Sequence, residues 1–167
     1  MPAVLETRSD CGRCAALCCI AYPSEDMPGF SAIKSAGEPC PKLGGNGLCT
    51  IYEHRAEEGF AGCIRFECFG AGQHVVQNLF AGNDWRNDQA LLGPMVDAFL
   101  AMRPVADLNF LAQRAHEMTD KAELRDKATV LAERLENVAQ SRSSLNDTAE
   151  VAAIERELRA LYQHFDR

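Results

Sequence analysis

The sequence predicts a mainly α-helical protein, in which an irregular cysteine-rich head is followed by a helical hairpin or small bundle. Two observations support this prediction. The eight cysteines all lie within residues 11–68, and the apolar residues of the C-terminal half recur at spacings of three and four. We therefore predict a cysteine-rich domain over residues 1–86 and an α-helical region over residues 87–167, which ends in an antiparallel helical hairpin.

Helical periodicity is predicted from residue 73 onward. Residues 73–81 and 88–102 carry apolar side chains at helical spacing. Pro94 is expected near a helix start or at a kink, and Pro104 is expected to close the segment because proline lacks the amide hydrogen that a helix interior needs. A further helix is predicted over residues 105–118.

Two seams of the coiled-coil type follow. Asp120-x-x-Glu123 and Asp147-x-x-Glu150 resemble capping boxes, and residues 141–146 form a polar break between the two runs. The seams consist of Leu124, Ala128, Leu131, Leu135 and Val138, and of Val151, Ile154, Leu158, Leu161 and Phe165. Each run is only about two heptads long, which favours packing within the chain, with self-association through the same helices as the alternative.

Composition and charge exclude several classes of protein. The 167 residues are 47% hydrophobic and 25% charged, as in ordinary globular proteins, and the longest apolar run, residues 14–22, is far below the roughly 18 residues of a membrane span. The start of the chain lacks the pattern of a secretory signal, so we expect a cytoplasmic protein. A net charge of −7 disfavours nucleic acid and anionic membranes as partners.

The cysteines carry most of the chemical information. They are Cys11, Cys14, Cys18, Cys19, Cys40, Cys49, Cys63 and Cys68. Four disulfides would need an oxidising compartment, whereas thiolates gathered in a reducing cytosol are more often metal ligands. We therefore predict a metal-organised head, with disulfides as the alternative.

The first four cysteines form the pattern C-x2-C-x3-C-C. On a helix running over residues 14–22, Cys11, Cys14 and Cys18 would share one face, whereas Cys19 would be rotated by about 100° from Cys18. Cys19 would then serve a second site, bridge a polynuclear centre or pack as a small apolar side chain.

The later four cysteines follow a different spacing. Prolines flank Cys40, and the glycine-rich residues 44–47 predict a turn that leads Cys49 back toward Cys40. Eight thiolates could fill two four-cysteine sites, although the paired C-x2-C knuckles of a zinc ribbon are missing. The C-x4-C spacing of Cys63 and Cys68 is compatible with an iron–sulfur site.

The cysteine pattern resembles the CxxCxxxCC family of zinc- or iron-chelating domains. The resemblance lies in Cys11 to Cys19, Cys40-Pro41, the run CTIYEHR over residues 49–55, and Cys63. This family is similar to the cysteine-cluster part of flagellin lysine methylases. Residues 59–63, 68–73 and 84–86 also resemble the cysteine-rich N-terminal segment of some bacterial pentapeptide-repeat proteins, although no pentapeptide repeat follows here. The resemblance covers about residues 8–86 and implies metal chelation by the cysteines.

Other chemical roles receive weaker support. Cys11-Gly12-Arg13-Cys14 could be a thioredoxin-like redox motif, but only ten residues precede it, which leaves no βαβ unit around it. His54 and His74 are further candidate ligands, whereas His116 and His164 are expected to be structural. No nucleophile, phosphate-loop or zinc-protease motif is present, so no catalytic residue is assigned.

Two functions of different classes remain open. The first is a metal-binding module for zinc or iron, with the C-terminal helices as a surface for a protein partner or for self-association. The second is an iron–sulfur redox protein or metalloenzyme that acts on another protein. A closed, fully thiolate-coordinated site would favour the first, and a reducible or open centre the second.

Overall fold

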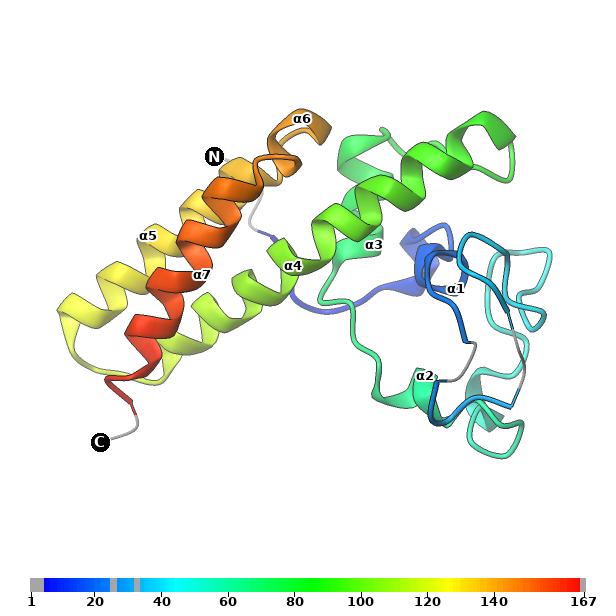
Figure 1. The fold of residues 1–167 in the computed structure, drawn as a ribbon, viewed down its shortest axis with the longest axis horizontal. Helices are drawn as coiled ribbons and strands as arrows, with labels where there is room; N and C mark the ends of the chain where they lie inside the picture. Colours follow the sequence, from blue (N-terminus) through cyan, green and yellow to red (C-terminus); the bar gives the residue numbers. More distant parts are fainter. Residues whose placement is uncertain (1–4, 25–26, 32–33, 166–167) are drawn as a thin grey trace.

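The structure is a computed structural model that describes residues 5–24, 27–31 and 34–165. The predicted mainly α-helical fold is confirmed, and no strand occurs among these residues (Figure 1). The α-helices are α1 (Leu17–Ala21), α2 (Ala61–Arg65), α3 (Ala71–His74), α4 (Leu92–Glu117), α5 (Ala122–Val138), α6 (Arg142–Leu145) and α7 (Thr148–Tyr162). Three short 3-10 turns, η1 (Cys11–Arg13), η2 (Tyr52–His54) and η4 (Gln89–Leu91), and one π-helical turn, η3 (Val75–Leu79), complete the described elements.

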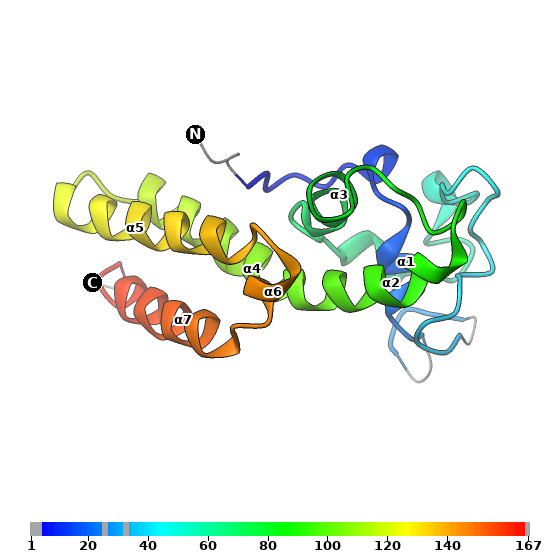
Figure 2. The same cartoon turned by 90° about the horizontal axis from the view of Figure 1, so that it is seen from above.

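The long helix α4 connects the two ends of the molecule. Its N-terminal part packs on α1 and α3 beside the cysteine-rich loops, and its C-terminal part packs on α5 and α7 (Figures 1 and 2). Met95, Phe99 and Met102 on α4 are fully buried in the same apolar cluster as Leu17 and Ile20 of α1. A single continuous core therefore joins the head and the C-terminal helices.

The C-terminal helices form a three-helix bundle with α4. All five residues of the first predicted seam are buried on α5, and Ile154, Leu158 and Leu161 of the second seam are buried on α7. The two helices lie side by side, with α6 in the short link between them (Figure 2). The predicted seams thus pack within the chain.

Two expected helix boundaries in this region are wrong. Pro104 does not close a helix, because α4 continues through it to Glu117. Pro104 and Leu100, whose carbonyl loses its helical partner, are both solvent-exposed, so water can satisfy that carbonyl. Asp120 is also not a cap: α5 begins after Lys121, which offers no side-chain cap. Asp147 does cap α7, and its carboxylate accepts from the amide of Glu150 at 3.0 Å.

The head consists of turns and helices of at most five residues. Among the described residues of the head, an isolated antiparallel β-bridge between Leu43 and Cys49 is the one β-type pairing of the backbone. Among the described residues, no helix is long and apolar enough to cross a membrane.

We expect truncation of a seam residue to destabilise the bundle. Leu135 is completely buried on α5, so Leu135→Ala should lower the free energy of unfolding by about 2–5 kcal/mol, as lost burial and a cavity combine. Val130 on the same helix is 52% exposed, so Val130→Ala is the matched control and should change it by less than about 0.5 kcal/mol. Denaturant unfolding followed by circular dichroism measures both. Equal effects would show that α5 is not packed as described.

Candidate metal centre

The structure places all eight cysteines in the head, and each is a free thiol. Cys11 is exposed on η1, Cys14 ends that turn, and Cys18 and Cys19 lie on α1. The others are partly buried: Cys40 and Cys49 on the turn of residues 40–49, Cys63 on α2, and Cys68 just before α3.

Five of these cysteines line one cavity. It has a volume of about 260 Å³ and is lined by cysteines from two distant segments, together with Leu48 and Tyr52. The lining cysteines are Cys11, Cys14, Cys18, Cys19 and Cys49. The Sγ atoms of Cys18 and Cys19 are 4.0 Å apart. The fold therefore gathers soft sulfur ligands, which suit zinc, copper(I) or iron–sulfur centres.

The predicted helix over residues 14–22 is wrong at its start. Ala16 has a left-handed backbone conformation (φ 55°), and the helix begins only at Leu17. The carbonyl of Ala15 accepts a hydrogen bond from the indole of Trp85 at 2.7 Å, so it is engaged by a distant side chain. Cys11 and Cys14 consequently approach the cavity from an irregular turn, whereas Cys18 and Cys19 approach it from a helix.

The turn over residues 40–49 brings Cys49 back toward Cys40, as the sequence predicts. The amide of Gly44 donates to the carbonyl of Leu48 at 2.8 Å, next to the bridge between Leu43 and Cys49. The amide of Cys40 donates to the carbonyl of Cys19 at 3.0 Å. This turn is therefore attached to α1 at the second residue of the Cys18-Cys19 pair.

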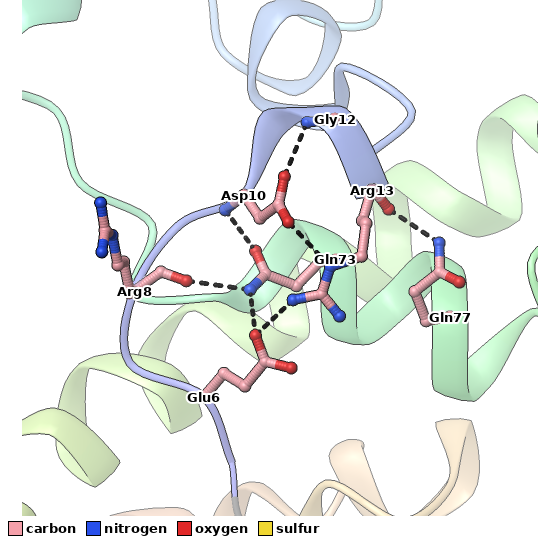
Figure 3. Close-up of polar contacts among 7 residues, drawn as sticks. All are labelled: Glu6, Arg8, Asp10, Gly12, Arg13, Gln73 and Gln77. Carbon is pink, nitrogen blue, oxygen red and sulfur yellow. Dashed lines mark hydrogen bonds and ion pairs between the residues drawn. The ribbon is translucent and has the colours of Figure 1, made fainter.

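Side chains of α3 and of the π-helical turn η3 hold the segment that carries the first two cysteines (Figure 3). The buried Gln73 amide donates to the Glu6 carboxylate at 2.8 Å and to the Arg8 carbonyl at 2.9 Å, and its oxygen accepts from the Asp10 amide at 2.7 Å. Gln77 donates to the carbonyl of Arg13 at 3.0 Å. Gln73 was not singled out from the sequence, because a lone glutamine gives no signal of what it will bind.

Two close approaches place Cys14 and Cys68 beside this segment. The hydroxyl of Ser9 lies 2.8 Å from the Cys68 sulfur. A Cβ atom at Gly72 would lie only 2.4 Å from the Cys14 sulfur, so only glycine leaves room for that thiol. The start of α3 thus forms one wall of the cysteine cluster.

Burial and neighbouring charge set the pKa values of the thiols. Burial raises the pKa of Cys14 to about 12, and burial together with the charges of Cys19, Cys40 and Cys49 raises the pKa of Cys63 to about 11. The hydrogen bond with Cys18 and the ammonium of Lys34 lower the pKa of Cys19 to about 7. Without a bound cation most of the cluster is thus held as neutral thiols, with Cys19 as the exception.

Lys34 is a second residue that the sequence did not indicate. It is buried, and its ammonium donates to the carbonyls of Ile20 and Ser35 at 3.0 and 3.1 Å and to that of Tyr22. These bonds place a positive charge at the C-terminal end of α1, near the thiols of Cys19 and Cys40.

The histidines lie in other surroundings. A ring nitrogen of His74 is 2.9 Å from the carbonyl of Ala139 at the end of α5, and His54 pairs with Glu57 at 3.2 Å on the surface. Each ring thus has a hydrogen-bonding partner outside the cysteine cluster.

The donor set fits a thiophilic metal, but the thiols are not yet at coordinating positions. Within residues 5–24, 27–31 and 34–165, no group of three histidine, cysteine or acidic side chains is arranged to hold a metal ion. The thiols stand on short turns and on the five-residue helices α1 and α2, so coordination would require several of these side chains to move. Coordination would also require proton loss from the thiols.

A bacterial relative shares part of the chain. A stretch of 100 residues is 40% identical to Uncharacterized protein YybG of Bacillus subtilis (strain 168), and it covers 60% of this chain and 36% of that protein. The chain thus spans about a third of the length of this relative. No family model and no solved structure matches the chain. The resemblance to the CxxCxxxCC family remains a prediction.

We expect Gln73→Ala to loosen the segment that carries Cys11 and Cys14. The substitution leaves the Asp10 amide without its partner and the Glu6 carboxylate with Arg13 alone, and it should lower the free energy of unfolding by about 1–3 kcal/mol. Gln77 is exposed and makes one hydrogen bond to the same segment, so Gln77→Ala is the control and should cost less than about 1 kcal/mol. Chemical denaturation of both variants tests this ordering, and a reversed order would contradict it.

We expect Cys19 to ionise before the other buried thiols. In reduced, metal-free protein its pKa of about 7 means that the thiolate, and hence alkylation by iodoacetamide, increases as the pH rises through 7. Cys14, with a pKa of about 12, should show no such midpoint between pH 6 and about 9. Peptide mass spectrometry after timed alkylation reads both residues in one sample. A Cys19 midpoint at the ordinary thiol value of about 8.5 would disprove the assignment.

Proposed function

We propose that this chain is a metal-binding protein whose cysteine thiolates coordinate zinc or iron, with an iron–sulfur cluster as one form of the iron centre. The observation that carries the proposal is the cavity at which Cys11, Cys14, Cys18, Cys19 and Cys49 meet as free thiols. The remaining three cysteines, Cys40, Cys63 and Cys68, belong to the same head and complete the candidate ligand set.

Physical chemistry supports a cation at this place. Gathering several thiols in one partly buried region raises their pKa values, so the cluster is poorly suited to hold negative charge by itself. A bound metal ion reverses that balance, because it stabilises thiolates and closes the surrounding loops. A reducing compartment such as the cytoplasm would keep the thiols available.

A second candidate function is an iron–sulfur redox protein or metalloenzyme that acts on another protein. It is favoured by an open polar pocket of about 460 Å³ beside the cavity. Cys11 and Tyr52 line both, and Arg8 and Arg13 with Glu6 and Asp10 line the polar side. An exposed ligand such as Cys11 next to a charged pocket is suited to contact between a metal centre and a substrate.

In the first function, the C-terminal helices serve as the surface for a protein partner or for self-association.

Elemental analysis with an ultraviolet–visible spectrum, on protein purified without oxygen, separates these candidates. Stoichiometric zinc without visible absorption supports a structural or storage module. Iron with acid-labile sulfide and a broad visible band supports the redox protein or enzyme. Absence of metal with all thiols oxidised in pairs would refute both and favour disulfides.

We expect chelation to alter the head while most of the helical signal persists. Trp85 is the single tryptophan and packs in the head against Ala15, so its fluorescence reports the order of the cysteine loops. Removing metal should shift its emission to longer wavelength, whereas far-ultraviolet circular dichroism should change little, because α4, α5 and α7 carry most of the helix. Restoring the metal should reverse the shift. If the emission is the same before and after verified metal removal, the head does not depend on metal.

A further inference from the structure

We infer that the eight cysteines form two adjacent four-thiolate sites, divided between Cys18 and Cys19. The first site consists of Cys11, Cys14, Cys18 and Cys68, and the second of Cys19, Cys40, Cys49 and Cys63. This inference rests on the proposed metal binding and adds the number of sites and the ligands of each.

The first group is assembled against α3. Gln73 on α3 and Gln77 on η3 hold the segment of Cys11 and Cys14 through hydrogen bonds to its backbone (Figure 3). They follow Cys68 in the sequence by five and nine residues. Ser9, from the same segment, lies 2.8 Å from the Cys68 sulfur. The sequence around residues 6–13 and the sequence around Cys68 are therefore fastened together at several points.

The first group also shares one environment. Cys14, Cys18 and Cys68 pack on the apolar core, and Cys11 forms the exposed corner of the group. The cysteines of the second group are not among the side chains that contact this core in the described part of the chain. Contact with the apolar core thus distinguishes Cys18 from Cys19, although both are partly buried, both line the same cavity and their sulfur atoms are 4.0 Å apart.

The second group is assembled on the turn over residues 40–49. The amide of Cys40 bonds to the carbonyl of Cys19, and the bridge between Leu43 and Cys49 closes the turn. Lys42 on this turn pairs with Glu58 at 3.0 Å, which ties the turn to the segment that leads into α2 and Cys63.

The surrounding polar groups fit this division. Arg55 donates to the carbonyl of Cys63 at 3.4 Å, and the buried Lys34 ammonium lies near Cys19 and Cys40. A divalent ion with four thiolates carries a net charge of −2, so a nearby ammonium lowers the cost of placing a second such site beside the first.

The experiment compares pairs of substitutions within one group with pairs across the groups. Reduced, metal-free full-length protein is titrated with Co²⁺ without oxygen, and thiolate-to-cobalt absorption gives the number of tightly bound ions. The within-group variants are Cys14→Ser/Cys68→Ser and Cys40→Ser/Cys63→Ser. The cross-group variants are Cys68→Ser/Cys63→Ser and Cys14→Ser/Cys40→Ser. Each of these four cysteines is replaced once in a within-group variant and once in a cross-group variant. The two kinds of variant therefore differ only in how the same substitutions are paired.

We expect two tightly bound ions in the unaltered protein, one in each within-group variant, and none in either cross-group variant. The ion retained by a within-group variant shows that its head still folds. Circular dichroism of the C-terminal helices checks the cross-group variants. A further variant, Gly72→Ala, keeps every thiol but places a methyl group against the Cys14 sulfur, so it should weaken the first site only.

Two other outcomes have separate meanings. If the unaltered protein binds two or more ions but all four double variants lose them together, the cysteines form one polynuclear cluster and the division is wrong, while metal binding stands. If the unaltered protein binds no Co²⁺ tightly, the two four-thiolate sites are wrong, and the proposed function is then decided separately by the elemental analysis for zinc, iron and acid-labile sulfide.

Discussion

The packing of α1 against α4 is the interaction on which the head depends. Leu17 and Ile20 are fully buried, and they fix a helix of only five residues against Phe99. Such a short helix has no stability of its own, so tertiary burial must hold it. Since Cys18 and Cys19 lie on this helix and Cys40 bonds to its backbone, the core of the helical region also positions the cysteine cluster.

Opposing electrostatic effects set the protonation states of the thiols in the cysteine cluster. Burial and mutual repulsion keep most thiols protonated, whereas the hydrogen bond with Cys18 and the Lys34 ammonium favour the thiolate of Cys19. Cys19 would therefore be the first cysteine of the cluster to lose its proton. Its sulfur lies beside that of Cys18, where the two proposed four-cysteine groups adjoin. In the proposed metal-binding role, the Cys19 thiolate would be the first sulfur to bind a cation, and the neighbouring thiols would lose their protons as the ion binds.

The sequence correctly predicted the helices that follow from hydrophobic periodicity. It did not predict the features of the structure that long-range contacts determine. The seam of α5, from Leu124 to Val138, is buried as its spacing indicates, because amphipathic helices bury one face whatever their partner. The break at Pro104 was wrong, since an exposed proline can be accommodated when water satisfies the freed carbonyl. The cysteines were identified as candidates from their types alone. Gln73 and Trp85 bond to residues more than 60 positions away, and Lys34 bonds to a helix 14 positions before it, which no local pattern reveals.

The continuity of α4 has a consequence for the solubility of the protein. Met95, Phe99 and Met102 are covered on one side by the head and lie on the same helix that completes the C-terminal bundle. An event that opened the head, such as oxidation of its thiols, would leave this apolar stripe facing water on a helix that the bundle still holds in place. Exposed stripes of this kind promote association between molecules. Damage to the cysteine loops would thus leave the C-terminal bundle folded with an exposed apolar surface. The protein would then aggregate when the head unfolds.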